Sequence, residues 1–203
     1  MDAAHGRGYA VLADLDGVLI DSAEQQRRAW KWWAQDVGID PDPFLDAHGW
    51  TGRDKIARWA SHLDPIAEVA RVIQHELEDL AGVVALPGAA DLLASDRLVG
   101  IVTSCTRALA LARLQAAGLK PRGVLITAES VIVGKPAPGP YLHGAELIGM
   151  VPRRCVAIED APDGVRSAIR AGMRVIAVTT TVGPAELTEA HVVLPDLAAY
   201  LRL

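Results

Sequence analysis

Long apolar runs are missing from this sequence. No stretch of about 18 consecutive apolar residues occurs, and the N-terminus MDAAHGRG lacks the basic-then-apolar order of a secretory signal peptide. We therefore expect no membrane partner and no export, and interpret the chain as cytoplasmic. Cysteine is scarce as well: Cys105 and Cys155 are the only two, and both lie in or beside apolar runs. This placement favours reduced thiols in a core over a disulfide framework.

Clusters of Lys and Arg are also missing, and the formal net charge is −5. Binding the backbone of a nucleic acid requires concentrated positive charge, so we expect no nucleic-acid partner, although a single small anion remains a possible ligand. The phosphate-binding pattern GxxxxGK[ST] does not occur. With 203 residues, 51% of them hydrophobic, the chain is long enough for one well-buried core with a smaller subdomain inserted. Nothing in the sequence indicates an oligomeric state.

Six short apolar runs recur along the chain, with helical stretches between them. Continuous runs rich in Val, Ile and Leu are typical of strands that are buried on both faces of a parallel sheet. The alternation predicts an α/β protein with a doubly wound, Rossmann-like parallel sheet. The runs lie at residues 9–14, 98–104, 124–127, 155–160, 174–180 and 191–195.

The interval between the first two runs is much longer than a simple crossover requires. It contains no convincing strand, and amphipathic stretches at about 24–37, 52–62 and 66–81 predict helices. Ser22 followed by Gln25 predicts a capping box at the first of them. We therefore expect a helical cap subdomain at 22–82, inserted into a core built from 1–21 and 83–203.

All five tryptophans lie within this insert. A small helical subdomain needs large side chains to build a core, and we expect Trp30, Trp33 and Trp59 to serve that purpose. Trp50, in the loop-like segment HGWTG, is expected to face a ligand instead.

Polar side chains follow the first four predicted strands. Because ligands of open parallel sheets bind outside the carboxyl ends of the strands, we expect these side chains to form one site. They are Asp14 and Asp16 after the first strand, Thr103, Ser104 and Thr106 after the second, Lys135 in the loop after the third, and Glu159 and Asp160 after the fourth.

Carboxylates that converge in this way repel one another by on the order of 4 kcal/mol per close pair, so a divalent cation is expected among them. A set of oxygen ligands without histidine or thiol favours a hard ion, and Mg²⁺ fits best because it keeps waters for substrate oxygens. Ser104 and Lys135 would then hold the remaining oxygens of a phosphoryl group.

Four motifs follow one another along the chain: DLDGVLIDS, TSCT, GKPAPGPYL and IEDAPDG. In this order and at these separations they resemble the four motifs of the haloacid dehalogenase-like (HAD) phosphohydrolases, and the resemblance covers nearly the whole chain. The helical insert resembles the family's helical cap. Within the family, HGWTGRDKIARW and TSCTR look most like the glycerol-phosphate and 2-deoxyglucose-6-phosphate phosphatases, whereas AEQQRRAWK is similar to β-phosphoglucomutase.

The resemblance implies a mechanism for the hydrolysis of phosphate monoesters. Asp14 would attack phosphorus to give an aspartyl-phosphate. Asp16 would donate a proton to the leaving alkoxide and later take one from water. Mg²⁺ would bind Asp14, the backbone carbonyl of Asp16, and Asp160, with Glu159 acting from behind these ligands or through water.

A cap loop that closes over the metal would recognise the leaving alcohol and exclude water. For this role we predict a set of substrate-binding residues in the insert and one residue after the second strand: His48, Trp50, Arg53, Lys55 and Thr106.

Other polar residues have structural explanations. Asp21 and Ser22 are expected to start a helix, Asp163 to place charge in a first helical turn, and Gly164 to allow close packing. Cys105 is not expected to be a nucleophile, because no base stands beside it in the sequence.

Three functions remain open at this stage. The preferred one is a phosphatase for a small sugar or polyol phosphate. The second is a phosphomutase, although Gln26 and Gly52 stand where β-phosphoglucomutase is expected to carry a histidine and an arginine. The third is a receiver-like regulatory domain, which would carry its phosphorylated Asp at the end of the third strand, where VLITAES offers none.

Overall fold

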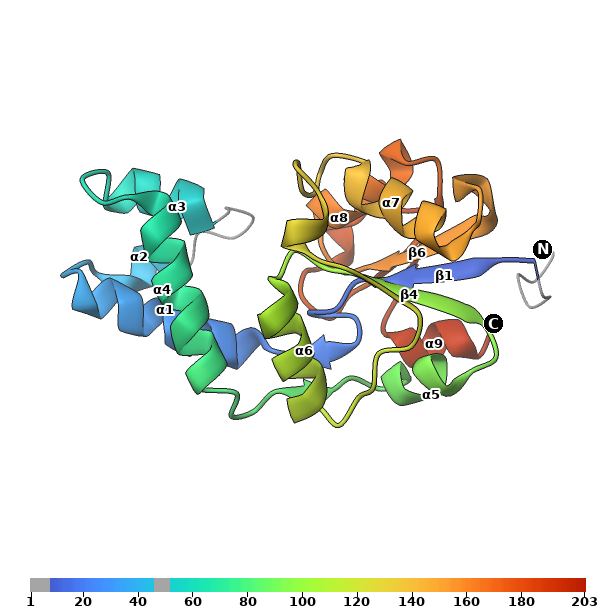
Figure 1. Ribbon diagram of the computed structural model, residues 1–203, viewed down its shortest axis with the longest axis horizontal. Coiled ribbons are helices and arrows are strands. Elements are labelled where there is room, and N and C mark those ends of the chain that lie inside the picture. Colours follow the sequence, from blue (N-terminus) through green and yellow to red (C-terminus); the bar gives the residue numbers. More distant parts are fainter. Residues whose placement is uncertain (1–7, 46–51) are drawn as a thin grey trace. The chain divides into compact units, whose positions relative to one another are not determined.

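A six-stranded parallel sheet forms the centre of the computed structural model, which describes residues 8–45 and 52–203 (Figure 1). The strand order is β5-β4-β1-β6-β7-β8. This confirms the predicted doubly wound α/β class and all six predicted strands. Asp14 and Asp160 lie just beyond their strands, whereas Glu159 is the last residue of its strand. The strands are β1 (Ala10–Ala13), β4 (Leu98–Val102), β5 (Val124–Ile126), β6 (Cys155–Glu159), β7 (Arg174–Val178) and β8 (Val192–Leu194).

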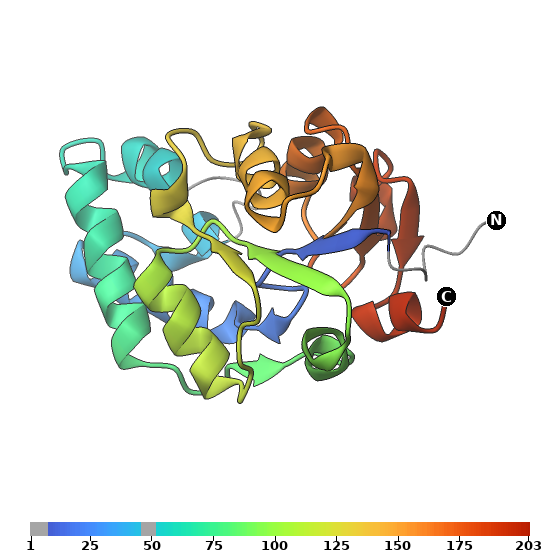
Figure 2. The same ribbon diagram turned by 45° about the vertical axis from the view of Figure 1, so that its right-hand side comes forward.

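Helices cover both faces of the sheet, which is why its central strands are apolar throughout. All of β1 and β6 and nearly all of β4 and β7 are buried. In Figures 1 and 2, α7 (Gly139–Ile148) and α8 (Pro162–Arg170) lie on one face, and α5 (Ala89–Ala94) and α9 (Leu197–Leu201) lie on the other.

The order of the strands reverses beside β1: β4 and β5 lie on one side of it, and β6, β7 and β8 on the other. Crevices that bind ligands open at such switch points, at the carboxyl ends of the strands. Ala13 pairs with Ile158, so the next residues on the two neighbouring strands are Asp14 and Glu159. The register alone therefore brings two of the predicted site carboxylates side by side.

The chain forms two compact units, Met1–Asp21 with Val84–Leu203, and Ser22–Val83. At their junction, β2 (Ile20–Asp21) pairs antiparallel with β3 (Val84–Ala85). The expectation that no strand lies between residues 15 and 97 is therefore wrong. Strands of two residues are too short to show a period in the sequence.

The second unit consists of helices among its described residues: α1 (Ala23–Asp36), α2 (Pro41–Leu45), α3 (Gly52–Trp59) and α4 (Pro65–Glu78). Trp33 is fully buried at its core, and Trp30 and Trp59 pack against this core, as predicted. The indole nitrogen of Trp33 donates to Glu68 at 2.7 Å, which satisfies the one polar atom of the ring. Trp50 lies outside the described residues.

The predicted capping box at the start of α1 is wrong. Ser22 occupies the N-cap position but its side chain makes no capping hydrogen bond. Gln25 instead turns into the helical unit and donates to the carbonyl of Glu76 on α4 at 2.7 Å, while Gln26 donates to the Ser22 hydroxyl at 2.9 Å. A tertiary contact has replaced the local one that the sequence pattern favours.

Among residues 8–45 and 52–203, none of the helices combines the length and the apolar character that crossing a bilayer requires.

Candidate active site

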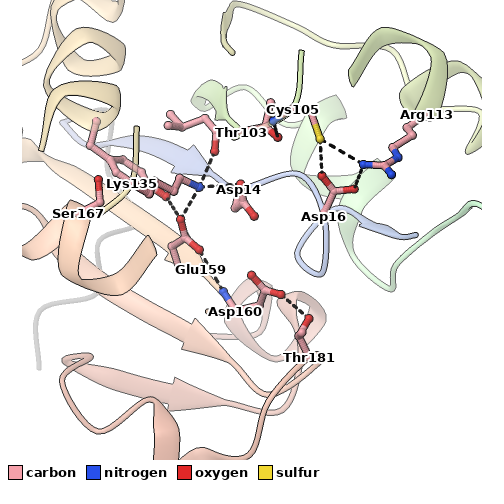
Figure 3. Close-up of polar contacts among 12 residues, drawn as sticks. Asp14, Asp16, Thr103, Cys105, Arg113, Lys135, Glu159, Asp160, Ser167 and Thr181 are labelled. Carbon is pink, nitrogen blue, oxygen red and sulfur yellow. Dashed lines mark hydrogen bonds and ion pairs between the residues drawn. The ribbon is translucent and has the colours of Figure 1, made fainter. Parts of the chain in front are cut away.

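Asp14 is the first residue beyond β1 and lies at the carboxyl edge of the sheet. Its backbone N–H donates to the carbonyl of Ile158 at 2.9 Å, which extends the pairing of β1 with β6 and fixes the backbone at this point. Its carboxylate Oδ1 accepts a hydrogen bond from Lys135 Nζ at 2.7 Å (Figure 3). The Asp14 side chain is 13% exposed, so one carboxylate at this edge remains partly open to solvent.

Lys135 holds two carboxylates together. Its ammonium group lies 2.7 Å from Asp14 and 2.6 Å from Glu159, and it also donates to the carbonyl of Val102 at 2.9 Å. Burial opposes the charge on this lysine, but the two carboxylates outweigh burial and raise the pKa of Lys135 above its ordinary value. The side chain is only 7% exposed and stays a cation.

The loop that carries Lys135 is fastened to α8 immediately after the lysine. Ser167 donates to the carbonyl of Ala137 at 2.6 Å, and Arg170 donates to the carbonyl of Pro136 at 3.0 Å. α8 directly follows β6, the strand that supplies Glu159, so one continuous segment both supplies this acid and anchors the lysine loop. This explains how a residue far from both acids in sequence reaches them.

Glu159 is buried and closely packed. Besides Lys135, the hydroxyl of Tyr141 donates to its Oε1 at 2.6 Å. Burial and then the charge of Glu159 raise the pKa of Tyr141 well above its usual range, so the phenol keeps the proton that it donates. A Cβ atom on Gly164 would lie 2.0 Å from the Glu159 carboxyl carbon, so the predicted close-packing role of this glycine is seen directly.

Asp160 is held by a hydrogen bond from the segment that follows the neighbouring strand β7. The hydroxyl of Thr181, beyond β7, donates to Asp160 Oδ2, and the hydroxyl of Thr180 donates to the carbonyl of Gly17. Gly17 has φ +78°, and a Cβ there would collide with the Asp160 carboxylate. The turn that follows Asp16 therefore requires a glycine, both for its backbone conformation and for the space that Asp160 occupies.

Three carboxylates gather at this edge: each of Asp14, Glu159 and Asp160 offers one oxygen atom, and these atoms lie within 4.8 Å of one another. Burial raises the pKa of Asp14 well above its usual range, with Glu159 and Asp160 adding to the shift and Lys135 opposing it. Burial and then Glu159 raise the pKa of Asp160 to about 7. An all-oxygen cluster whose negative charge is disfavoured in this way fits a hard divalent cation such as Mg²⁺.

Asp16 points away from this cluster. Its Oδ1 accepts from an Arg113 guanidinium nitrogen at 3.0 Å, and its Oδ2 accepts from the Cys105 thiol at 3.0 Å (Figure 3). Burial and then the negative charge of Asp16 raise the pKa of Cys105 well above its ordinary value, so the thiol stays protonated. This agrees with the expectation that Cys105 is not a nucleophile.

Comparison with known proteins identifies the family. The family model for haloacid dehalogenase-like hydrolases matches residues 10–172, which include all four motifs. The chain belongs to the haloacid dehalogenase-like hydrolases. It is therefore an enzyme, as the motifs predict.

Three known proteins are similar to this chain over most of their length. Hexitol phosphatase A of Escherichia coli is 41% identical over 92% of this chain and 90% of its own. Glycerol-1-phosphate phosphohydrolase 2 of Saccharomyces cerevisiae is 30% identical over 85% and 75%. The crystal structure of CbbY from Rhodobacter sphaeroides in complex with phosphate superimposes with a TM-score of 0.81 at 25% identity, covering 96% of this chain and 99% of that one.

Of the predicted site residues, Asp14, Lys135, Glu159 and Asp160 come together in the HAD hydrolase. Ser104 is exposed in the turn after β4. Thr106 caps α6 (Arg107–Ala116) by accepting from the backbone N–H of Leu109 at 3.4 Å. The phosphate-binding role of Ser104 and the substrate-binding role of Thr106 stay predictions.

The predicted substrate-binding residues of the helical unit have mixed placements. Arg53 is exposed and Lys55 half-buried on α3, and burial lowers the pKa of Lys55. His48 and Trp50 lie outside the described residues. Their contacts with substrate stay predictions.

Three residues that hold the site carboxylates were not predicted from the sequence: Tyr141, Thr181 and Arg113. Tyr141 lies within the motif GKPAPGPYL, yet nothing in that pattern names its partner. Arg113 could have been noticed, because it shares a helix face with the buried residues Leu109, Ala110 and Leu114. An arginine on an apolar helix face is unusual unless a partner neutralises it.

Proposed function

We propose that this hydrolase is a Mg²⁺-dependent phosphatase that acts on a small sugar or polyol phosphate, with a hexitol phosphate the first candidate. The single observation that carries the proposal is the Asp14 carboxylate, which is partly open to solvent, bonded to Lys135, and grouped with Glu159 and Asp160. The 41% identity to a hexitol phosphatase over nearly the whole of both chains supports the substrate class.

In the first half-reaction, Asp14 attacks phosphorus and the bond to the leaving oxygen breaks, which gives an aspartyl-phosphate. Asp16 gives its proton to the departing alkoxide. Lys135 and Ser104 hold the non-bridging oxygens, the lysine by charge and the serine by donating its hydroxyl. In the second half-reaction, water attacks the aspartyl-phosphate, Asp16 takes its proton, and phosphate and free Asp14 result.

The cation belongs with the acidic cluster. Asp14, the backbone carbonyl of Asp16, and Asp160 would hold it, and Mg²⁺ would supply positive charge to the phosphoryl oxygens. Glu159 is already bonded to Lys135 and Tyr141, so we assign it to orienting the lysine and to a contact with the ion through water.

The phosphomutase alternative has less support. A Cβ atom at Gly52 would lie 2.8 Å from the Trp30 ring, so the arginine expected of β-phosphoglucomutase does not fit there without moving the indole. The Gln26 amide is bonded to Ser22. Membership of a hydrolase family decides against the receiver-like alternative.

A phosphate-release screen tests the proposal. The substrates are glycerol, hexose, deoxyhexose, hexitol and nucleoside monophosphates, each with Mg²⁺ and with excess chelator, and Asp14→Asn is the inactive control. We expect turnover of polyol or sugar phosphates that disappears with chelator and in Asp14→Asn. No release from any of them by the wild-type protein would contradict the proposal. β-Glucose 1-phosphate, assayed for both free phosphate and glucose 6-phosphate, separates hydrolysis from mutase activity.

A further inference from the structure

Arg113 is a buried cation that the proposed reaction does not yet use. It lies two turns into α6, and its side chain is 2% exposed. Side chains on a helix lean toward its N-terminus, and that of Arg113 reaches back to Cys105, ahead of the helix, at 3.1 Å. The N-terminus of α6 adjoins the carboxyl edge of the sheet, so the buried guanidinium of Arg113 lies next to the site.

The Asp16 carboxylate is held by both of its oxygens. Arg113 donates to Oδ1 and Cys105 donates to Oδ2, each at 3.0 Å, and Arg113 also donates to the Cys105 sulfur. Two donors on two different oxygens restrict rotation of the carboxylate plane. The arrangement also separates the two aspartates of the first motif, because Lys135 holds Asp14 while Arg113 holds Asp16 (Figure 3).

Burying a guanidinium is costly, and an apolar side chain of similar size at this position would avoid that cost. A contribution to stability is therefore a weak reason for an arginine here. Its partner is Asp16, the carboxylate whose orientation matters for the proposed proton transfers. Proton transfer demands a donor within hydrogen-bond reach and in line, so a fixed carboxylate favours it.

We propose that Arg113, with Cys105, is a positioning residue that aligns the Asp16 carboxylate for proton transfer to the leaving alkoxide. This inference rests on the proposed function, in which Asp16 is the acid. It differs from a structural role in one measurable respect. Loss of alignment should harm substrates that need a proton on the leaving oxygen and spare those that do not.

Two substrates make this distinction. The p-nitrophenolate ion is a stable leaving group without protonation, whereas an alkoxide is not. The second-order constant kcat/KM covers the steps up to departure of the leaving group, so the later hydrolysis of aspartyl-phosphate does not enter it. The probes are p-nitrophenyl phosphate and an alkyl phosphate, which is sorbitol 6-phosphate or the one that the screen ranks first. The readout is the kcat/KM for p-nitrophenyl phosphate divided by the kcat/KM for the alkyl phosphate.

The variants are Asp16→Asn, Arg113→Met, Arg113→Lys and the double variant Asp16→Asn/Arg113→Met. Arg174→Met is the matched control, because Arg174 is exposed at the opposite, amino end of β7. We expect Arg113→Met to raise the ratio about tenfold, part of the roughly 10²-fold change expected for Asp16→Asn. Arg113→Lys, which keeps the charge but not the fork, should raise the ratio less. The double variant should match Asp16→Asn, and Arg174→Met the wild type.

Several outcomes would overturn the inference. They are an equal loss on both substrates, a gain in activity on removing Arg113, or a further rise of the ratio in the double variant. If Arg113→Met does not fold, Arg113→Lys and Cys105→Ala decide, and an unchanged ratio in both overturns it. A wild-type protein inactive on both probes overturns the proposed function as well. A normal Asp16→Asn effect without an Arg113 effect overturns this inference alone.

Discussion

Gly164→Ala tests the packing around Glu159 more sharply than any change to a charged residue. In an ordinary helix interior, Gly→Ala stabilises by about 1 kcal/mol. Here the added Cβ would lie 2.0 Å from the Glu159 carboxyl carbon, and the carboxylate cannot retreat without leaving Lys135 and Tyr141. The methyl group must therefore displace either α8 or the carboxylate.

The expected size follows from these two costs. Overpacking a core costs about 1–3 kcal/mol, and breaking a buried hydrogen bond to a charged group costs about 1–3 kcal/mol more. After the helix-propensity gain of about 1 kcal/mol is subtracted, the free energy of unfolding should fall by roughly 1–5 kcal/mol. For a chain of this size this corresponds to a drop in Tm of about 2–20 °C. Turnover should also fall, because Lys135 loses one of the carboxylates that position it.

Thermal unfolding followed by circular dichroism measures the effect. Gly139→Ala is the matched control, because Gly139 is also helical and its added Cβ would have only ordinary contact, 3.5 Å from the Val133 carbonyl oxygen. In a Glu159→Ala background, where the obstructing carboxylate is gone, Gly164→Ala should cost little. A Gly164→Ala protein as stable as the wild type, or an undiminished cost without the carboxylate, would refute the reasoning.

Three further predictions concern the charges of the site. Lys135→Ala should lower kcat by about 10²-fold or more and raise KM for the phosphate ester; steady-state kinetics unchanged in both would make the lysine structural. Thr181→Val should weaken Mg²⁺ binding by about tenfold or more, because Asp160 loses its hydroxyl donor. Thr188→Val, at an exposed threonine, is the control. The measurement is the Mg²⁺ concentration that gives half of the thermal stabilisation, and an unchanged value in Thr181→Val would contradict the prediction. The pKa of Asp160 is raised to about 7 in the fold, so the protonated carboxyl group stabilises the metal-free protein at low pH. This contribution is lost as pH rises through 7. The gain in Tm on adding Mg²⁺ should therefore grow between about pH 5 and pH 8, since binding requires the deprotonated carboxylate, and an equal gain at both would argue against Asp160 as a ligand.

The sheet and the acidic cluster could be predicted because each leaves a local mark in the sequence. Strands buried on both faces are apolar at every position, and the residue that ends such a strand sits at the ligand-binding edge whatever its partners are. Asp14 and Asp160 needed no further information. The ribbon of β2 and β3 left no such mark, because two residues carry no period.

The groups that hold the acids could not be predicted, because their partners are set by tertiary packing. Gln25 satisfies the sequence pattern of a capping box, yet it binds the carbonyl of Glu76 from another helix. Tyr141, Thr181 and Arg113 each reach an acid that lies many positions away along the chain. Only Arg113 carried a signal, as a cation on an apolar helix face.

The pairing of β2 with β3 has a consequence for how this protein can change. Ile20 faces Ala85 and Asp21 faces Val84, so the chain departs for the helical unit and returns from it on adjacent strands. The two ends of this excursion are therefore adjacent in a two-stranded sheet of their own, and a turn of hairpin length could replace residues 22–83. If those residues select the alcohol, as the sequence predicts, then evolution or a protein engineer can exchange this part of the chain without changing the residues that cleave the phosphate ester.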